Sequence, residues 1–174
     1  MPQPSEHQTR FVEYLCRLAT TENRAALAAL RRGLGKPPGT TPEMFRYVEP
    51  LAPQDYRADN YYLVAALFAL HPENSTEGNL GTTVAKLRQQ AAHEGEDSLE
   101  KRFVALLNAH GDDLPDHLRH AISLARSKAV PVNWAHLLSD LGYWDHEDRF
   151  VQRQWAHEYW GRTEAVSADT DEQS

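Results

Sequence analysis

Apolar residues recur at helical spacing along most of this chain. Near its start, Phe11, Leu15 and Leu18 are separated by four and then three positions, and a similar stripe runs through residues 27–34. Because this spacing places apolar side chains on one side of an α-helix, it predicts two amphipathic helices at the beginning of the chain. Thr21 is the expected cap between them.

Residues 33–53 break this pattern. The segment holds five of the ten prolines and three of the nine glycines. Proline removes a backbone donor and fixes φ, so prolines at this density stop both helices and strands. We therefore expect a long Gly/Pro-rich crossover after the second helix.

The remainder of the chain returns to helical patterning. The run from Asp55 to Pro72 is apolar over most of its circumference, which predicts a central helix. Asp97 and Glu100 resemble a capping box, and Asp113 is a candidate cap for the following helix. No segment alternates with the two-residue period of a strand. We predict an all-α fold of about eight helices, and those after the first two cover residues 55–71, 80–95, 97–110, 113–129, 133–144 and 147–160.

Length and charge divide the chain into a domain and a tail. The 174 residues suffice for one substantial core. The formal charge is −7, but residues 164–174 contribute four acids and no base, which leaves 21 acids against 18 bases in residues 1–163. This composition predicts one helical domain over residues 1–163 and a disordered acidic tail over residues 164–174.

The sequence predicts a cytoplasmic protein without a bilayer span. No apolar run approaches the roughly 20 residues of a membrane-spanning helix. The start MPQPSEHQTR lacks the basic and apolar regions of a secretory signal. Cys16 is the single cysteine, so an internal disulfide and a thiolate metal cluster are excluded. Its apolar neighbours predict a buried structural thiol.

No pattern of catalytic or metal-binding residues emerges. The nine histidines form no HExxH motif, and His117 and His120, three positions apart, lack a third ligand. The chain has no GxSxG motif, and its glycine-rich stretch at 33–39 follows a helix and contains prolines that cannot donate amides to phosphate. The grouped carboxylates coincide with predicted helix starts, where they stabilise the helix dipole. We expect no enzyme activity, no metal and no cofactor.

The basic residues are the stronger indication of function. From Asn23 to Pro42 the chain carries four cations and no acid. On their helices Arg24 and Arg31 share a face, as do Arg119 and Arg126. Such surfaces attract the phosphates of nucleic acids, although a solvated helix face explains the first cluster equally well. The candidate nucleic-acid-binding residues are Arg24, Arg31, Arg32, Lys36, Arg57, Lys101, Arg102, Arg119, Arg126, Lys128, Arg149 and Arg153.

Four tryptophans lie after residue 130, at positions 134, 144, 155 and 160. Aromatic rings serve as stacking platforms for the bases of single-stranded nucleic acids. At helical spacing near the end of a domain, however, they more often lock a helical bundle together. We therefore favour a role in core packing.

Taken in order, several segments resemble the CasB family, the small subunit of the type I-E CRISPR complex Cascade. They span residues 11–160 and read LAALRRGLGKPPG, YYLVAALFALHP, NLGTTVAKL, SLEKRFVALLNA, LPDHLRHAISLARSKAVPVNWAHLLSDL and VQRQWAHEYW. The resemblance implies an all-helical, non-enzymatic protein. It also implies that Arg31 and Arg32 form the family's LRR pair, and that Arg102 and Arg119 lie in its RF and LR elements.

The resemblance further implies the partners. CasB occurs as a pair of copies along the belly of Cascade, where it contacts the backbone and large subunits. It helps to hold the guide RNA, the target DNA strand and the displaced non-target strand. By this resemblance we expect a nucleic-acid-binding subunit that stabilises the R-loop through phosphate contacts, while guide pairing supplies sequence specificity. Arg57, Arg126, Lys128 and Arg153 occupy neighbourhoods similar to those of basic residues in the family.

Two other functions are compatible with the residues. The same basic faces would suit an adaptor that docks acidic surfaces of other subunits and contacts no nucleic acid. A helical hydrolase that uses the histidines and carboxylates is the weakest hypothesis, because the sequence lacks the ligand motifs that such chemistry requires.

Overall fold

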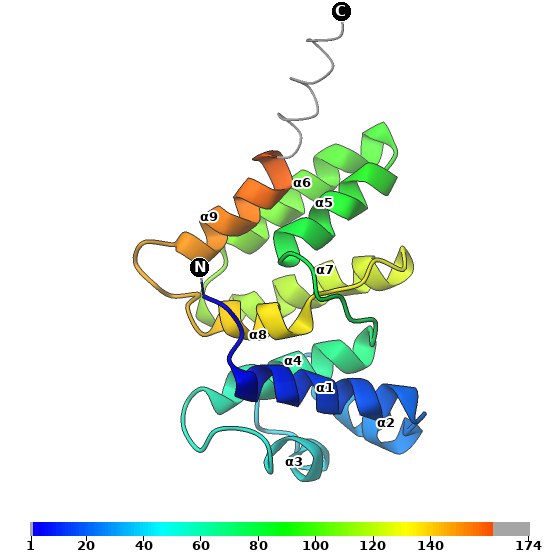
Figure 1. Cartoon of the computed structure of the whole chain (residues 1–174). Coiled ribbons are helices and arrows are strands. Elements are labelled where there is room, and N and C mark those ends of the chain that lie inside the picture. Colours follow the sequence, from blue (N-terminus) through cyan, green and yellow to red (C-terminus); the bar gives the residue numbers. More distant parts are fainter. Residues whose placement is uncertain (1, 162–174) are drawn as a thin grey trace, which may run out of the picture.

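The structure, a computed structural model, describes residues 2–161 as a stack of helices (Figure 1). No β-strand forms in this part of the chain, which confirms the predicted all-α fold. The expected tail at 164–174 lies outside the described residues. The elements are α1 (Glu6–Thr20), α2 (Arg24–Arg31), α3 (Pro42–Val48), α4 (Ala58–Leu70), α5 (Leu80–Gln90), α6 (His93–Asn108), the 3₁₀ turn η1 (Gly111–Asp113), α7 (Leu114–Ser127), α8 (Trp134–Leu141), α9 (Phe150–Ala156) and the π-helical turn η2 (His157–Gly161).

Helix α4 is the centre of the lower half of the molecule. Eight of its thirteen residues are buried, because its sequence is apolar around most of the helix. It packs against α2 on one side and against α7 and α8 on others. The sequence therefore predicted the role of this helix correctly.

The helices are arranged in three tiers (Figure 1). Helices α1 to α4 form one end, α5, α6 and α9 form the other, and α7 and α8 lie between them. The chain passes between the tiers through the segment after α4, which runs beside the segment after α7. There His71 Nε2 lies 2.7 Å from the carbonyl oxygen of Val130, and Asn74 forms an isolated parallel bridge with Val132.

The crossover at 33–53 contains a helix that the sequence analysis missed. Helix α3 begins at Pro42 and buries Met44 and Val48. A proline in the first turn of a helix costs no hydrogen bond, because the first amides of a helix have no intrahelical acceptor. The rest of the segment is irregular, as expected, and Gly35 and Gly39 both take φ of +75°.

The predicted capping box at the start of α6 is wrong. Helix α5 ends at Gln90 rather than near Gly95, and α6 begins at His93 after Ala92 as its cap. Asp97 therefore lies inside α6 and caps nothing. The acids of this segment suggested a cap at the wrong position. Glu94 and Glu96 lie in the first turn of α6, where their charge interacts favourably with the helix dipole and needs no capping hydrogen bond.

Two further details of the helix ends differ from expectation. Thr21 lies between the two helices as expected but caps the end of α1, while Asn23 caps the start of α2 with its side chain accepting from the amide of Ala26. Asp113 does precede α7, but its side chain makes no capping hydrogen bond.

The single cysteine also differs from expectation. Cys16 is half-buried rather than buried, and burial is the main cause that raises the pKa of its thiol.

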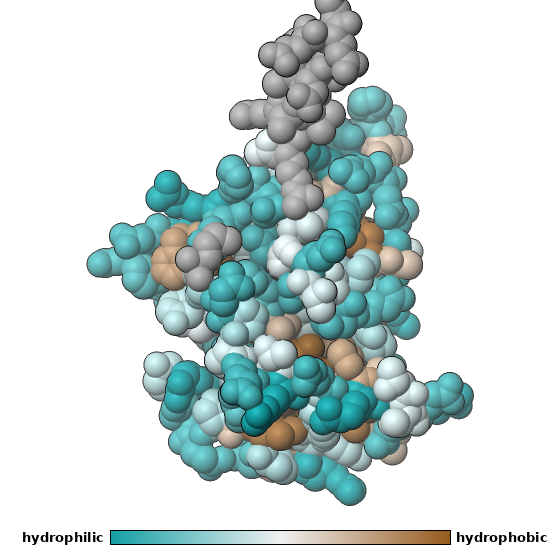
Figure 2. Space-filling view, in the orientation of Figure 1, coloured by the Kyte–Doolittle hydropathy of each residue, from teal (hydrophilic) through white to brown (hydrophobic). Residues whose placement is uncertain are grey.

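The tryptophans belong largely to the core, as the sequence analysis favoured. Trp134, Trp144 and Trp155 are buried, and Trp160 is partly buried against the core. Trp134 Nε1 donates to the carbonyl of Glu73, and Trp144 Nε1 donates to the carbonyl of Ala109. Each of these two indoles thus has a backbone partner far away in the sequence, which fixes the loops onto the helices. The face seen in Figure 2 is correspondingly hydrophilic, with only scattered apolar residues.

Helix α5 approaches the last helix so closely that only glycine fits at one position. Gly81, in the first turn of α5, is buried against the backbone of Trp155. A Cβ atom built on Gly81 would lie 2.7 Å from Cα of Trp155 and 2.8 Å from its carbonyl carbon. Because both atoms are backbone, no side-chain rotation relieves the clash.

We expect Gly81→Ala to destabilise the protein by about 2 kcal/mol, since α5 and α9 would have to move apart. Gly95→Ala is the matched control, because its added Cβ would meet no atom nearer than Ala91 Cβ at 3.6 Å. In this exposed helical position alanine should raise stability by about 0.5–1 kcal/mol. Urea unfolding followed by circular dichroism measures both values. Equal effects of the two substitutions would contradict the close approach.

A buried polar pair joins α8 to α9. His136 Nε2 lies 3.5 Å from Oδ1 of Asp140, and Trp155 Nε1 donates to Oδ2 of the same carboxyl at 2.7 Å. Burial raises the pKa of Asp140 to about 7, against a lowering effect of the hydrogen bond from Trp155, and burial lowers the pKa of His136. The pair is therefore favoured in its uncharged form.

Asp140→Asn should change how stability depends on pH. In the unfolded chain an aspartate titrates near pH 4, whereas in the folded protein Asp140 titrates at about 7. The folded state holds this proton more tightly, so the free energy of unfolding falls as pH rises between these values, by about 1.4 kcal/mol per unit of pKa difference. His136 contributes the opposite slope below its ordinary pKa, in both proteins.

The asparagine variant lacks the contribution of Asp140 but keeps an oxygen that accepts from Trp155. Relative to the natural protein, its stability should rise with pH between about pH 4 and about pH 7. Urea unfolding across this range measures the difference. A stability difference that stays constant with pH would show that Asp140 is ionised in the folded protein.

Candidate nucleic-acid interface

The first basic surface lies on α2 and the loop that follows it. Arg24 and Arg31 are both exposed and lie at opposite ends of the same helix face. Arg32, at the end of α2, makes an exposed ion pair with Glu43 at 3.3 Å. The pKa of Glu43 is lowered first by a backbone hydrogen bond at the start of α3 and then by Arg32 and Lys36. The structure thus adds an acid beside the acid-free stretch.

The loop after α2 brings Lys36 close to α7. Gly35 packs against Arg119, and a Cβ atom added at this glycine would lie 2.8 Å from Nη1 of the guanidinium. Lys36 and Arg119 border the same small pocket between the loop, α4 and α7. Arg119 also lies 3.5 Å from Asp116, one turn earlier on its helix. Two candidates that are distant in the sequence are therefore neighbours in the structure.

A second basic surface lies between α6 and α7. Arg102, His117 and His120 line a groove of about 600 Å³ whose floor is apolar and whose lining includes no carboxylate. The two histidines do share a face, as their spacing indicated. Among the residues that the structure describes, no group of three possible metal ligands comes together. The groove suits an anion better than a metal ion.

The remaining candidates are dispersed. Arg126 and Lys128 are exposed at the end of α7, and Arg153 is exposed on α9. Lys101 borders a shallow surface beside Asp97 and Glu100 rather than the groove that holds Arg102. The candidates thus occupy several separate surfaces.

Two candidates are held by close partners within the chain. Arg57 donates through Nε and Nη2 to the carboxylate of Asp55, with a shortest distance of 2.6 Å. This side-chain hydrogen bond is the main cause that lowers the pKa of Asp55 and raises that of Arg57. Arg149 donates through Nη2 to the carbonyl of Leu107 and so ties the loop before α9 to α6.

Eight candidates are exposed and make no ion pair with any residue in the range 2–161. They are Arg24, Arg31, Lys36, Lys101, Arg102, Arg126, Lys128 and Arg153. An exposed cation without a partner is free to meet a phosphate without first losing a contact. These eight define the surface charge that is available to an external polyanion.

The sequence analysis missed a groove at another edge of the molecule. It has a volume of about 950 Å³ and is lined by the exposed rings of Tyr56 and Tyr143. The predicted helices 55–71 and 133–144 included these two tyrosines, but α4 begins at Ala58 and α8 ends at Leu141, so both lie in segments that join helices. Helical periodicity therefore gave no indication that their rings are exposed.

The fold and these surfaces define a helical protein with several exposed basic patches and, in its described part, no cluster of metal ligands. The profile of the family described as CRISPR-associated protein Cse2 matches residues 26–160. A CRISPR-associated protein Cse2 from Thermus thermophilus is 41% identical over 157 residues, which cover 87% of this chain and 89% of the relative. The chain belongs to the Cse2 family, also called CasB, and the predicted resemblance is confirmed.

Solved structures agree with this assignment. The crystal structure of CasB from Thermus thermophilus has 38% identity and a TM-score of 0.76, over 88% of this chain and 97% of that one. CasB from M. ruber has 30% identity and a TM-score of 0.76, over 95% and 98% of the two chains. A chain of a structure named CRISPR RNA-guided surveillance complex has 29% identity and a TM-score of 0.80, again over 95% and 98%.

The pair formed by Arg57 and Asp55 gives a direct test of the site geometry. We expect the carboxyl of Asp55 to titrate below its ordinary range and to return toward that range in Arg57→Gln, because glutamine removes the cation and its charge-assisted hydrogen bonds. Carboxyl chemical shifts followed by NMR during a pH titration measure this. Arg153→Gln, which removes an unpaired arginine, should leave Asp55 unchanged. An unshifted Asp55 in the natural protein would contradict the pairing.

Proposed function

We propose that this chain is a subunit of a CRISPR RNA-guided surveillance complex, where its exposed arginines and lysines hold nucleic-acid strands by their phosphates. The ligands would be the guide RNA, the target DNA strand and the displaced non-target strand. The observation that carries the proposal is the fold match to a chain of such a complex over 95% of this chain, with a TM-score of 0.80. Membership of the Cse2 family supports the same role.

The chemistry of the surface supports contact with phosphates rather than with base edges. The available groups are cations on exposed helix faces and loops, which attract any nucleic-acid backbone regardless of sequence. The ion pairs of Arg32 with Glu43 and of Arg119 with Asp116 are exposed, so water and salt already weaken them. Both arginines can exchange an acid for a phosphate when a strand arrives.

The distribution of charge explains why strong binding of nucleic acid would need the assembled complex. The chain has a formal charge of −7, and its unpaired cations lie on several surfaces. Each neutralised duplex phosphate adds only about 0.9 to the magnitude of the slope of log K against log salt concentration. A small patch that contacts few phosphates therefore gives weak affinity. Within an assembly, other subunits would position the strand, and each patch would add its contacts at a high effective concentration.

The remaining parts of the proposal follow from the family. We infer a non-catalytic subunit that stabilises the R-loop, occurs as two copies, and contacts the backbone and large subunits of the complex. No helix among residues 2–161 is long and apolar enough to span a membrane. We infer that the subunit works in the cytoplasm, where its nucleic-acid ligands are found.

Replacing Arg31 and Arg32 by alanine should weaken binding of the assembled complex to DNA. We expect about a tenfold loss of affinity at low salt and a decrease of about 1.5–2 in the salt slope, across unrelated flanking sequences. Fluorescence anisotropy with labelled DNA at several salt concentrations measures both quantities. The amount of this subunit in the purified complex is measured in the same samples. If the chain were an adaptor that contacts no nucleic acid, the variant would join the complex less well, and its DNA affinity would fall only for that reason.

Arg10→Ala with Arg46→Ala is the matched control, since it removes two exposed arginines that lie outside the set of candidate residues. Arg10 pairs with Glu6, and Arg46 lies over the ring of Tyr47 at 5.2 Å. If both double variants weaken binding equally, net charge rather than the patch on α2 is responsible. Unchanged DNA binding by the Arg31 and Arg32 variant would remove this patch from the proposal.

A further inference from the structure

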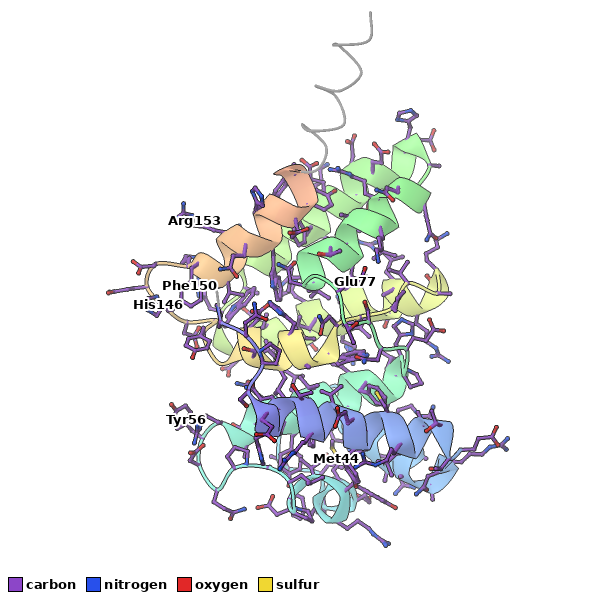
Figure 3. All side chains as sticks on the ribbon, viewed as in Figure 1. Met44, Tyr56, Glu77, His146, Phe150 and Arg153 are labelled. Carbon is purple, nitrogen blue, oxygen red and sulfur yellow. The ribbon has the colours of Figure 1, made fainter. Side chains whose placement is uncertain are left out.

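A large groove lies where four loops and helix ends meet. It has a volume of about 950 Å³ and is bordered by the loop after α2, the start of α4, the turn η1 with the start of α7, and the loop after α8. Figure 3 shows two residues of its lining, Tyr56 and His146, along one edge of the molecule. The family assignment and the fold give this groove no role.

Exposed aromatic rings mark this groove as a contact surface. Of the four large hydrophobic side chains that are exposed in the described part, two line it: Tyr56 is 87% exposed and Tyr143 is 48% exposed. The ring of Tyr56 contributes almost nothing to the core and stands in water. Tyrosine is among the residues that most often anchor protein interfaces, because it offers a rigid apolar face and a polar hydroxyl.

The charge of the lining selects the kind of partner. Four carboxylates, those of Asp59, Asp112, Asp116 and Asp145, line the groove against two cations, Lys36 and Arg57. Arg57 is already bound to Asp55, and Asp116 pairs with Arg119, so the unpaired groups are three carboxylates and one lysine. The groove therefore repels phosphate and attracts basic side chains.

This excess of acid also decides between possible occupants. A nucleic-acid strand would place its phosphates against four aspartates. The chain's own residues after 163 carry four acids and no base, so they are repelled as well. A segment of another protein that presents arginine or lysine side chains fits the charge, and it would place these side chains over tyrosine faces and beside carboxylates at once.

We propose that this groove docks a basic segment of a partner protein in which arginine or lysine alternates with apolar residues. The cations contact Asp59 and Asp145, the tyrosine rings stack on the guanidinium groups, and the apolar residues cover the partly exposed lining formed by Leu63 and Pro115. The inference goes beyond the proposed contacts with nucleic acid and uses a different surface. The partner class is a protein, and the charge of its segment is the feature that is recognised.

Charge reversal in the groove tests the proposal. Asp59→Lys with Asp145→Lys is compared with Glu94→Lys and Asp97→Lys in α6, which change the net charge equally and also remove one acid from the first turn of a helix. Each protein is co-expressed with the other subunits of the surveillance complex, and its content in the purified complex is measured. The groove variant should show about a tenfold loss of incorporation, and the control should incorporate normally.

A peptide titration makes the result independent of the complex. A fluorescein-labelled peptide of alternating leucine and arginine is titrated with the full chain, and a peptide with glutamate for arginine serves as its control. The groove variant should bind the basic peptide about tenfold more weakly than the natural chain or the α6 variant does. Tyr56→Ala, which leaves the charge unchanged, should weaken binding about threefold to tenfold.

Several results would overturn the proposal. One is equal peptide binding by the natural chain and by the groove variant. Another is a groove variant that joins the complex normally and binds DNA more tightly than the natural chain does. The acids of the groove would then serve only to repel nucleic acid. A third is a loss confined to self-association in sedimentation velocity, which would assign the groove to a second copy of this chain. Failure of the natural chain to join the complex would refute the proposed function, while the peptide titration still decides the role of the groove.

Discussion

The fold depends on burying α4 around most of its circumference. A helix that is apolar over so much of its surface is stable in water only if other elements cover it. Here α1, α2, α3, α7 and α8 supply that cover. Helices α1, α2 and α7 each use one apolar stripe for α4 or its neighbours, so their opposite faces lie at the surface, whereas α8 is buried along almost its whole length. The burial of α4 thereby helps to determine which residues of α2 and α7 meet the solvent.

This constraint explains how the basic residues come to be available. The buried faces of α2 and α7 carry Leu30 and Leu118, so Arg31 and Arg126 are directed away from the core. The same helices that enclose α4 therefore present cations outward on both sides of it. Loops then adjust the result, because the Gly-rich turn after α2 brings Lys36 to Arg119. Packing creates the charged surfaces, and no separate binding module is required.

Much of the fold was predictable from sequence because helical periodicity is a local signal. The central helix at 55–71 and the buried tryptophans followed directly from it. Features that depend on side-chain geometry, or on contacts between distant segments, were not predictable. The pairing of Arg57 with Asp55 and of Arg32 with Glu43 depends on side-chain geometry, and the acidic groove joins residues from four segments. Residue type identified the candidate cations, but only the structure separated the free ones from those already engaged.

The separation of charge on this surface has a consequence for assembly. A protein with uniformly dispersed charge would contact strands and partner subunits with the same faces, and each ligand would compete with the other. Here the unpaired cations on α2, α6 and α7 lie outside the groove that gathers Asp59, Asp112 and Asp145, apart from Lys36 at its border. Because attraction for phosphate on one surface is accompanied by repulsion on the other, a strand is guided away from the groove. Under the two proposals, one small helical domain binds two classes of ligand on separate surfaces.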